Sequence, residues 1–167
     1  KIANRDAEKM ISRHPHVFVN KNIEGIDKAI EKWENMKRKE KNINTYTESM
    51  KQIPKELPAL MKSYKIQKKA ANAGFDWDDV RDAFKKIHEE TEELLEVYQG
   101  DDRKRIEDEV GDLLFAVVNV ARFLKVNPEE ALNTSSRKFI SRFGFIEETA
   151  AAAGRQLEEM TLAEMDL

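Results

Sequence analysis

The amino-acid sequence predicts an all-α protein, and three observations support that class. Charged residues make up 37% of the 167 residues and hydrophobic residues 40%, a balance typical of helical domains. Only 6 glycines and 4 prolines interrupt the chain. Apolar residues recur every three or four positions in most of the remaining stretches, which is the spacing of one helix face. We therefore expect helices joined by short turns, with the larger part packed as a four-helix bundle-like domain.

The expected elements follow from this periodicity and from the turn residues between them. Residues 42–53 are polar and uneven, which favours a linker. The last residues, 155–167, favour a short helix or a frayed tail. The helices are expected at residues 1–13, 24–41, 54–73, 78–98, 102–125 and 127–153.

Residues with strong positional preferences suggest where individual helices begin and end. Pro54 and Pro58 should open the helix that follows the linker, and Gly74 should end it. Asp76 or Asp78 is the expected N-cap of the next helix, because an aspartate oxygen can accept from the first free backbone amides. An Asn-Pro pair at residues 127–128 is expected to cap the last long helix.

A short internal repeat suggests how the chain is divided. Residues 8–13 resemble residues 137–142 in sequence; the first copy precedes the helix expected at residues 24–41, and the second precedes the acidic tail. Residues 1–41 are therefore expected to be the helical end of a first repeat. Residues 54–167 are expected to form most of a second, with the linker between them.

Two acidic helices carry the most informative pattern in the chain. A helix turns about 100° per residue, so Glu90 and Glu93 lie at about 300° and 240° from Ile87, the centre of the first apolar stripe. Glu109 and Asp112 fall at the same two angles on the second acidic helix. If the stripes pack together, four carboxylates converge at one edge of the core.

Clustered carboxylates repel one another, and burial raises the cost of their charge. A divalent cation would relieve both effects, and oxygen ligands of this kind suit Mg²⁺, Mn²⁺ or Ca²⁺. The alternative is an ordinary solvated acidic face. That interpretation suits Glu89, Glu92 and Glu96, which point away from the apolar stripe.

Composition also excludes several functions. The net charge of −3 provides no field for a nucleic-acid polymer, although a mononucleotide needs only a few local cations. The absence of cysteine excludes disulfides, thiolate metal sites and cysteine nucleophiles. The longest apolar run, residues 113–121, is too short to span a membrane, and no signal peptide is apparent. A cytoplasmic location is the default expectation.

The acidic motifs and their neighbours resemble the all-α nucleoside triphosphate pyrophosphohydrolases of the MazG type. The acidic part of the resemblance is Glu89-Glu90-x-x-Glu93 followed by Glu109-x-x-Asp112. Flanking segments narrow it to MazG and extend it over nearly the whole chain. These segments are Arg13-His14-Pro15-His16-Val17-Phe18, Lys65-Ile66-Gln67, Gly74-Phe75-Asp76-Trp77 and Gly111-Asp112-Leu113-Leu114-Phe115.

The resemblance implies a dimeric enzyme with two tandem helical repeats, of which the second is typically active. It implies hydrolysis of nucleoside triphosphates to monophosphates and pyrophosphate with Mg²⁺, for which Mn²⁺ is a possible substitute, in house-cleaning of the nucleotide pool. By motif matching, Glu90, Glu93, Glu109 and Asp112 would be metal ligands. Glu89 is the remaining motif carboxylate, in an outer or water-orienting role.

Four cations are the candidates for binding the triphosphate. Arg105 matches a basic residue of the family one turn before the second motif, and Lys138 and Arg142 match its basic pair. Lys86 occupies the position equivalent to Arg105 on the first acidic helix. Lys86 and Arg105 have an alternative, an ordinary ion pair with the glutamate four residues later. Lys138 and Arg142 have no acid four residues before them.

Some features depart from the family pattern. The acidic helices of the first repeat are absent, so residues 1–41 should hold no site of their own. Ser136 stands where the family has asparagine, and the tryptophan and lysine expected after the acidic tail are missing. Apolar faces on all four helices of the second repeat favour a homodimer, unless residues 1–41 cover the spare face. The competing function is a non-catalytic helical interaction module with an acidic docking face.

Overall fold

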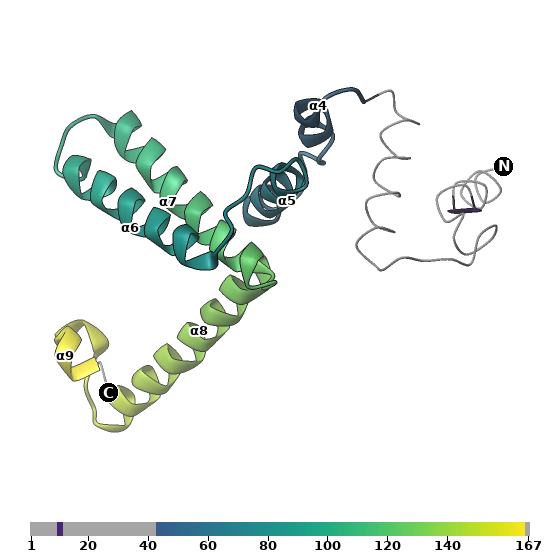
Figure 1. The fold of residues 1–167 in the computed structure, drawn as a ribbon. Helices are drawn as coiled ribbons and strands as arrows, with labels where there is room; N and C mark the ends of the chain where they lie inside the picture. Colours follow the sequence, from purple (N-terminus) through teal and green to yellow (C-terminus); the bar gives the residue numbers. More distant parts are fainter. Residues whose placement is uncertain (1–9, 12–42, 166–167) are drawn as a thin grey trace. The chain divides into compact units, whose positions relative to one another are not determined.

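The computed structural model describes residues 10–11 and 43–165, and every regular element in these ranges is helical (Figure 1). The all-α prediction is therefore confirmed. Of the expected helices at residues 1–13 and 24–41, only Met10 and Ile11 are described, and both are helical. The rest of the predicted first repeat, including His14-Pro15-His16, lies outside the described residues.

The described part of the chain divides into two compact units. The first contains residues 43–55 and 69–75 and includes helix α4, Tyr46–Lys51. Thr45 and Glu48 form a capping box at the start of α4, and the Lys69 amine donates to the buried Ser49 hydroxyl at 2.7 Å. The expected linker at residues 42–53 is therefore partly helical, because this box satisfies the first amides of a helical turn.

Helix α5, Ala59–Ala71, begins after Pro58 rather than at Pro54. Its end follows the predicted glycine signal. Gly74 has φ +86°, and the Phe75 amide reaches back to the Ala70 carbonyl at 3.0 Å. A residue without Cβ adopts this left-handed conformation without strain, so the helix ends as expected.

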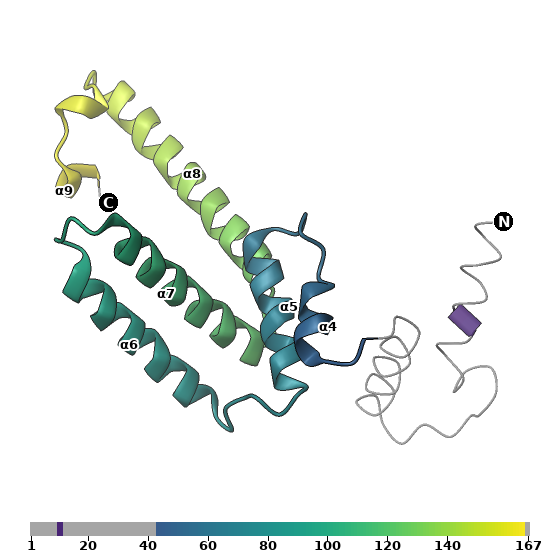
Figure 2. The ribbon, with the colours of Figure 1, turned by 90° about the horizontal axis from the view of Figure 1, so that it is seen from above.

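Helices α6, Val80–Val97, and α7, Arg103–Phe123, form a hairpin in the second unit, which comprises residues 56–68 and 76–167. They lie side by side along their lengths (Figures 1 and 2). The buried apolar residues of these two helices are small or β-branched. They are Ala83, Val97, Ala116, Val118 and Val120.

The N-cap of α6 differs from the expected one. Asp79 accepts from the Arg81 amide at 2.8 Å, so it caps the helix in place of Asp76 or Asp78. Asp76 instead forms an ion pair with Arg122 near the end of α7, with one contact at 2.9 Å. Asp76 therefore pairs with a residue far away in the sequence and does not cap the helix.

The turn after α7 is built from local bonds. Lys125 has φ +57°, and the Val126 amide donates to the Ala121 carbonyl at 2.9 Å. As predicted, Asn127 caps α8, Pro128–Ala152, and its side chain accepts from the amides two and three residues later. Pro128 occupies the first helical turn, where its missing amide hydrogen does no harm.

Helix α8 is the most exposed long element in the described residues. It contacts α7 far less than α6 does and diverges from the hairpin after the turn (Figure 1). Phe139 on its apolar face is 68% exposed, and Leu132 and Phe143 on that face are exposed too; these three residues are called the apolar row of α8. Within residues 43–165, α8 thus does not complete the bundle-like packing expected from sequence.

The chain turns back after α8 at Gly154, which has φ +68°. A short 3-10 helix, Leu157–Glu159, and helix α9, Leu162–Met165, follow. The tail is therefore a pair of short helices in its described part. Among the described helices, none combines the length and the apolar composition that crossing a membrane requires.

Candidate functional site

Three of the four predicted metal-binding carboxylates meet between α6 and α7. Glu90, Glu109 and Asp112 each offer one oxygen, and these oxygens all lie within 4.8 Å of one another. Glu90 is buried at 4% exposure, Glu109 is half-buried and Asp112 is exposed. The cluster is therefore sealed on one side and open on the other, as a site for a cation and its ligand should be.

The Glu90 carboxylate is only partly satisfied by protein groups. One oxygen, Oε1, lies 2.5 Å from the Lys86 amine. The other, Oε2, is buried and has no hydrogen-bond partner among the described residues. An unpaired buried carboxylate oxygen is costly, and a cation bound at the cluster would supply the missing partner. The oxygen-only donor set suits hard cations such as Mg²⁺, Mn²⁺ and Ca²⁺.

Lys86 holds two of the motif glutamates. Its amine lies 2.5 Å from Glu90 and 2.9 Å from the exposed Glu89. The hydrogen bond to Glu90, followed by that to Glu89, raises the pKa of Lys86. The predicted ion pair between Lys86 and the glutamate four residues later is confirmed. A contact between Lys86 and substrate stays a prediction.

Glu93 lies beside the cluster but outside the group of three. Partial burial raises the pKa of Glu93, and the negative charges of Glu90 and Glu109 raise it further. The Glu93 carboxylate is therefore close enough to Glu90 and Glu109 to be repelled by their charges. A rotation of this side chain would be needed for it to join the other three as a ligand.

Lys86 contacts the cluster through Glu90, whereas the other three predicted substrate-binding cations form no ion pair with the clustered carboxylates within residues 43–165. Lys138 and Arg142 are exposed on α8, and no ion pair joins either to an acid within residues 43–165. Arg105 is exposed near the start of α7, where its backbone amide donates to the Asp102 side chain at 3.1 Å. In the same part of the chain it forms no ion pair with Glu109, so the alternative considered for Arg105 is not observed.

Comparison with known proteins identifies the domain that carries this cluster. Residues 80–143 match the model of the MazG nucleotide pyrophosphohydrolase domain. This stretch of the chain is a MazG domain. It includes α6, α7 and the first part of α8, and so contains all four predicted ligands and all four predicted cations. The resemblance seen in the sequence motifs is confirmed.

Curated relatives match nearly the whole chain. A protein of Escherichia coli strain K12 named nucleoside triphosphate pyrophosphohydrolase is 38% identical over 162 residues, which is 96% of this chain and 62% of the relative. A Thermotoga maritima protein named nucleoside triphosphate pyrophosphohydrolase/pyrophosphatase MazG is 40% identical over 159 residues, or 95% of this chain and 59% of the relative. The uncharacterized protein YabN of Bacillus subtilis is 46% identical over 161 residues, covering 96% of this chain and 33% of that protein. The chain therefore spans less than two thirds of each of these relatives.

One buried polar group outside the MazG match escaped the sequence-based site prediction. Gln67 on α5 is 6% exposed, and its side-chain amine donates to the Phe115 carbonyl of α7 at 2.8 Å. Its oxygen is buried without a partner. One sequence signal could have identified it: Gln67 lies three residues after Tyr64, so it falls on the same face of the helix as apolar residues. Gln67 thereby joins α5 to the helix that carries two of the clustered carboxylates.

Proposed function

We propose that the MazG domain hydrolyses nucleoside triphosphates to nucleoside monophosphates and pyrophosphate with a divalent cation, for which Mg²⁺ is favoured and Mn²⁺ is a possible substitute. The observation that carries the proposal is the carboxylate cluster of Glu90, Glu109 and Asp112, with one buried oxygen of Glu90 left unpartnered. The printed names of two relatives support the reaction class.

The reaction adds one water across the anhydride between the α and β phosphates. A bond forms between the water oxygen and phosphorus, the bridging P–O bond breaks, and one proton is released with the two products. A triphosphate carries about four negative charges, so charge neutralisation dominates catalysis. A cation bound at the cluster would neutralise phosphate charge and lower the pKa of a bound water.

The chain's own residues have separate roles in this proposal. Glu90, Glu109 and Asp112 hold the cation, and Glu93 completes the ligand set after side-chain rotation. Glu89 acts in an outer role, because its carboxylate binds Lys86 and fixes the amine that also binds Glu90.

Cations on α7 and α8 would bind the phosphate oxygens. Lys138 and Arg142 lie four residues apart on one side of α8, and Arg can bind two oxygens at once. Arg105 and Lys86 lie one turn before the two carboxylate pairs and would approach the same ligand. For Lys86 this requires sharing its amine with the two glutamates that it already binds.

Assembly as a homodimer belongs to the same proposal. The apolar row of α8 is exposed in a single chain, and a second copy would bury it. We further place the enzyme in the cytoplasm as a house-cleaning activity, because nucleotides are its proposed substrates. A nucleic-acid polymer and a membrane have no role in this function.

Calorimetry and product analysis test the proposal together. Mg²⁺ and a triphosphate analogue with a methylene bridge between the α and β phosphates should each bind more tightly in the presence of the other. Chromatography of a reaction with an ordinary triphosphate should show monophosphate and pyrophosphate. Binding that is independent of Mg²⁺, or products that are diphosphate and phosphate, would refute the proposal. Absence of any nucleotide binding would favour a helical interaction module instead.

A further inference from the structure

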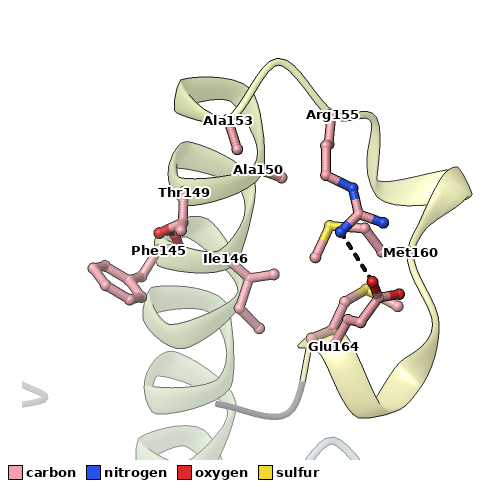
Figure 3. A pocket seen from close by; sticks show the side chains of 9 residues that line it. Phe145, Ile146, Thr149, Ala150, Ala153, Arg155, Met160 and Glu164 are labelled. Carbon is pink, nitrogen blue, oxygen red and sulfur yellow. Dashed lines mark hydrogen bonds and ion pairs between the residues drawn. The ribbon is translucent and has the colours of Figure 1, made fainter.

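A pocket of about 400 Å³ lies between the end of α8 and the returning tail. Ile146 and Ala150 on α8 face the tail across it (Figure 3). Ala153 lines it at the end of α8, and Met160 and Met165 line it from the tail. Most of the lining is apolar, and two thioether side chains can adapt to a flat ligand.

One ion pair gives this pocket a polar edge. The Arg155 guanidinium lies 3.0 Å from Glu164 Oε1, and both residues line the pocket (Figure 3). The other oxygen of Glu164 accepts from the Thr161 amide at 2.8 Å. The edge therefore presents a donor and an acceptor next to each other, which complements the polar edge of a nucleobase.

The pocket is in register with the predicted phosphate-binding cations. Lys138, Arg142, Ile146 and Ala150 are spaced four residues apart, and each step turns about 40° around α8, so Arg142 lies about 40° and Lys138 about 80° around the helix from Ile146. Arg142 lies about 6 Å and Lys138 about 12 Å along the helix axis from Ile146. A ribose and its phosphates can extend over that distance from a base held in the pocket.

We propose that this pocket binds the nucleobase of the nucleotide whose phosphates Lys138 and Arg142 contact. The inference rests on the proposed function and adds the residues that recognise the base. Ile146, Ala150 and Met160 contact the faces of the ring, and Arg155 and Glu164 exchange part of their ion pair for bonds to its edge. The helix α8 thereby binds both ends of one ligand.

A matched pair of variants, each with one alanine replaced by phenylalanine, tests the assignment. Ala153→Phe fills the pocket, whereas Ala152→Phe adds the same group to a neighbouring residue outside its lining. Calorimetry with Mg²⁺ compares the methylene-bridged triphosphate analogue with inorganic tripolyphosphate, which has no base. Ala153→Phe should weaken binding of the analogue by about tenfold and of tripolyphosphate by less than about twofold. Ala152→Phe should leave both affinities near those of the wild type.

The outcomes separate this inference from the proposed function. If the wild type binds neither probe, the proposed function fails and the base site falls with it. If the wild type binds both and Ala153→Phe weakens neither, or weakens both equally, only the base site is wrong. A change in the molar mass of Ala153→Phe would show that a second copy fills the pocket, which also overturns it. Should Ala153→Phe fail to fold, Met160→Ala decides, with selective weakening of the analogue expected.

Discussion

The α6–α7 hairpin and helix α8 are both amphipathic, yet within the described residues the hairpin buries more of its apolar side chains than α8 does. The two helices of the hairpin contain five buried apolar residues, and the carboxylate cluster forms from their middle turns. Helix α8 is longer than either, but only Pro128 and Ala150, near its two ends, are buried.

This difference separates two requirements of the proposed reaction. The cluster needs only the hairpin, because Glu90, Glu109 and Asp112 come from α6 and α7. The cations Lys138 and Arg142 lie on α8, which makes few contacts with the hairpin within the described residues. Metal binding should therefore be a property of the hairpin, whereas triphosphate binding should depend on α8 and on what covers it.

Removal of a clustered carboxylate should have the largest effect. We expect Glu90→Gln, Glu109→Gln or Asp112→Asn to lower turnover by at least about 100-fold, more than outer-shell changes usually do. The matched control is Glu92→Gln, which changes an exposed glutamate of the same helix as Glu90. Steady-state kinetics at saturating Mg²⁺ measure the effect. Near-normal turnover in two of the three variants would be incompatible with a shared site.

Disruption of the exposed row should show whether α8 is covered by a second copy. We expect Phe139→Glu to weaken dimerisation by about 30-fold, because it removes a large aromatic contact and buries a charge. Light scattering over a dilution series measures the change in molar mass. Ser141→Glu, on the opposite side of α8, should leave the mass unchanged. A wild-type protein that is monomeric at micromolar concentration would exclude the dimer.

Loss of the α8 cations should separate triphosphate binding from metal binding. We expect Lys138→Ala and Arg142→Ala each to lower kcat/KM by about tenfold or more, since each loses a charged contact to phosphate. Mg²⁺ affinity of the free protein should change by less than about twofold. Arg137→Ala is the control on the same helix. Unchanged kcat and KM in both variants would show that neither residue binds phosphate.

A smaller effect should follow from removal of the ammonium group at the cluster. Lys86→Gln leaves Glu90 without its protein partner, so the metal-free protein should lose about 1 kcal/mol, a modest value because Lys86 is 37% exposed. The same change should tighten Mg²⁺ binding, because a competing cation has gone. Thermal unfolding and calorimetry measure the two effects. Lys85→Gln, which removes an exposed pair with Asp82, should change neither appreciably.

The smallest predicted effect concerns the tail that closes the pocket. Two Thr161 groups and Arg155 lower the pKa of Glu164 to about 2 from 4.5, with the Thr161 amide contributing most. Because the pKa of Glu164 is lowered on folding, its ionised carboxylate stabilises the folded tail above pH 4.5, and this stabilisation is lost as the pH falls towards 2. The protection of the α9 amides from hydrogen exchange, relative to an unstructured peptide at the same pH, should therefore fall in that window. Glu164→Gln should remove the dependence, and Glu159→Gln should retain it.

Helix bounds and the acidic pairs were predictable because both depend on neighbours within one helix. The observed bounds of α6, α7 and α8 lie within about two residues of those expected from periodicity and turn residues. The Thr45 and Glu48 capping box was also present in the sequence, but the polar composition of residues 42–53 favoured a linker.

Features that depend on distant residues were not predictable. Asp76 appeared to be a cap, but its partner Arg122 is 46 residues away. The unequal burial of the clustered carboxylates depends on how α6 meets α7. The angles around α6 predicted both Glu90 and Glu93 as metal ligands, whereas the observed group of three contains only Glu90 of the two. The pocket depends on a tail that folds back against α8, and although Gly154 marks the turn, no local pattern specifies which tail residues then face the helix.

The turn between α7 and α8 has a consequence for assembly. The left-handed Lys125, the amide bond from Val126 to Ala121 and the fixed ring of Pro128 set the direction in which α8 leaves the hairpin. The backbone entropy of this turn is therefore lost when the chain folds rather than when it associates. Helix α8 is preorganised in this sense, and a partner or nucleotide that meets its exposed row gains affinity because little conformational freedom remains to be lost.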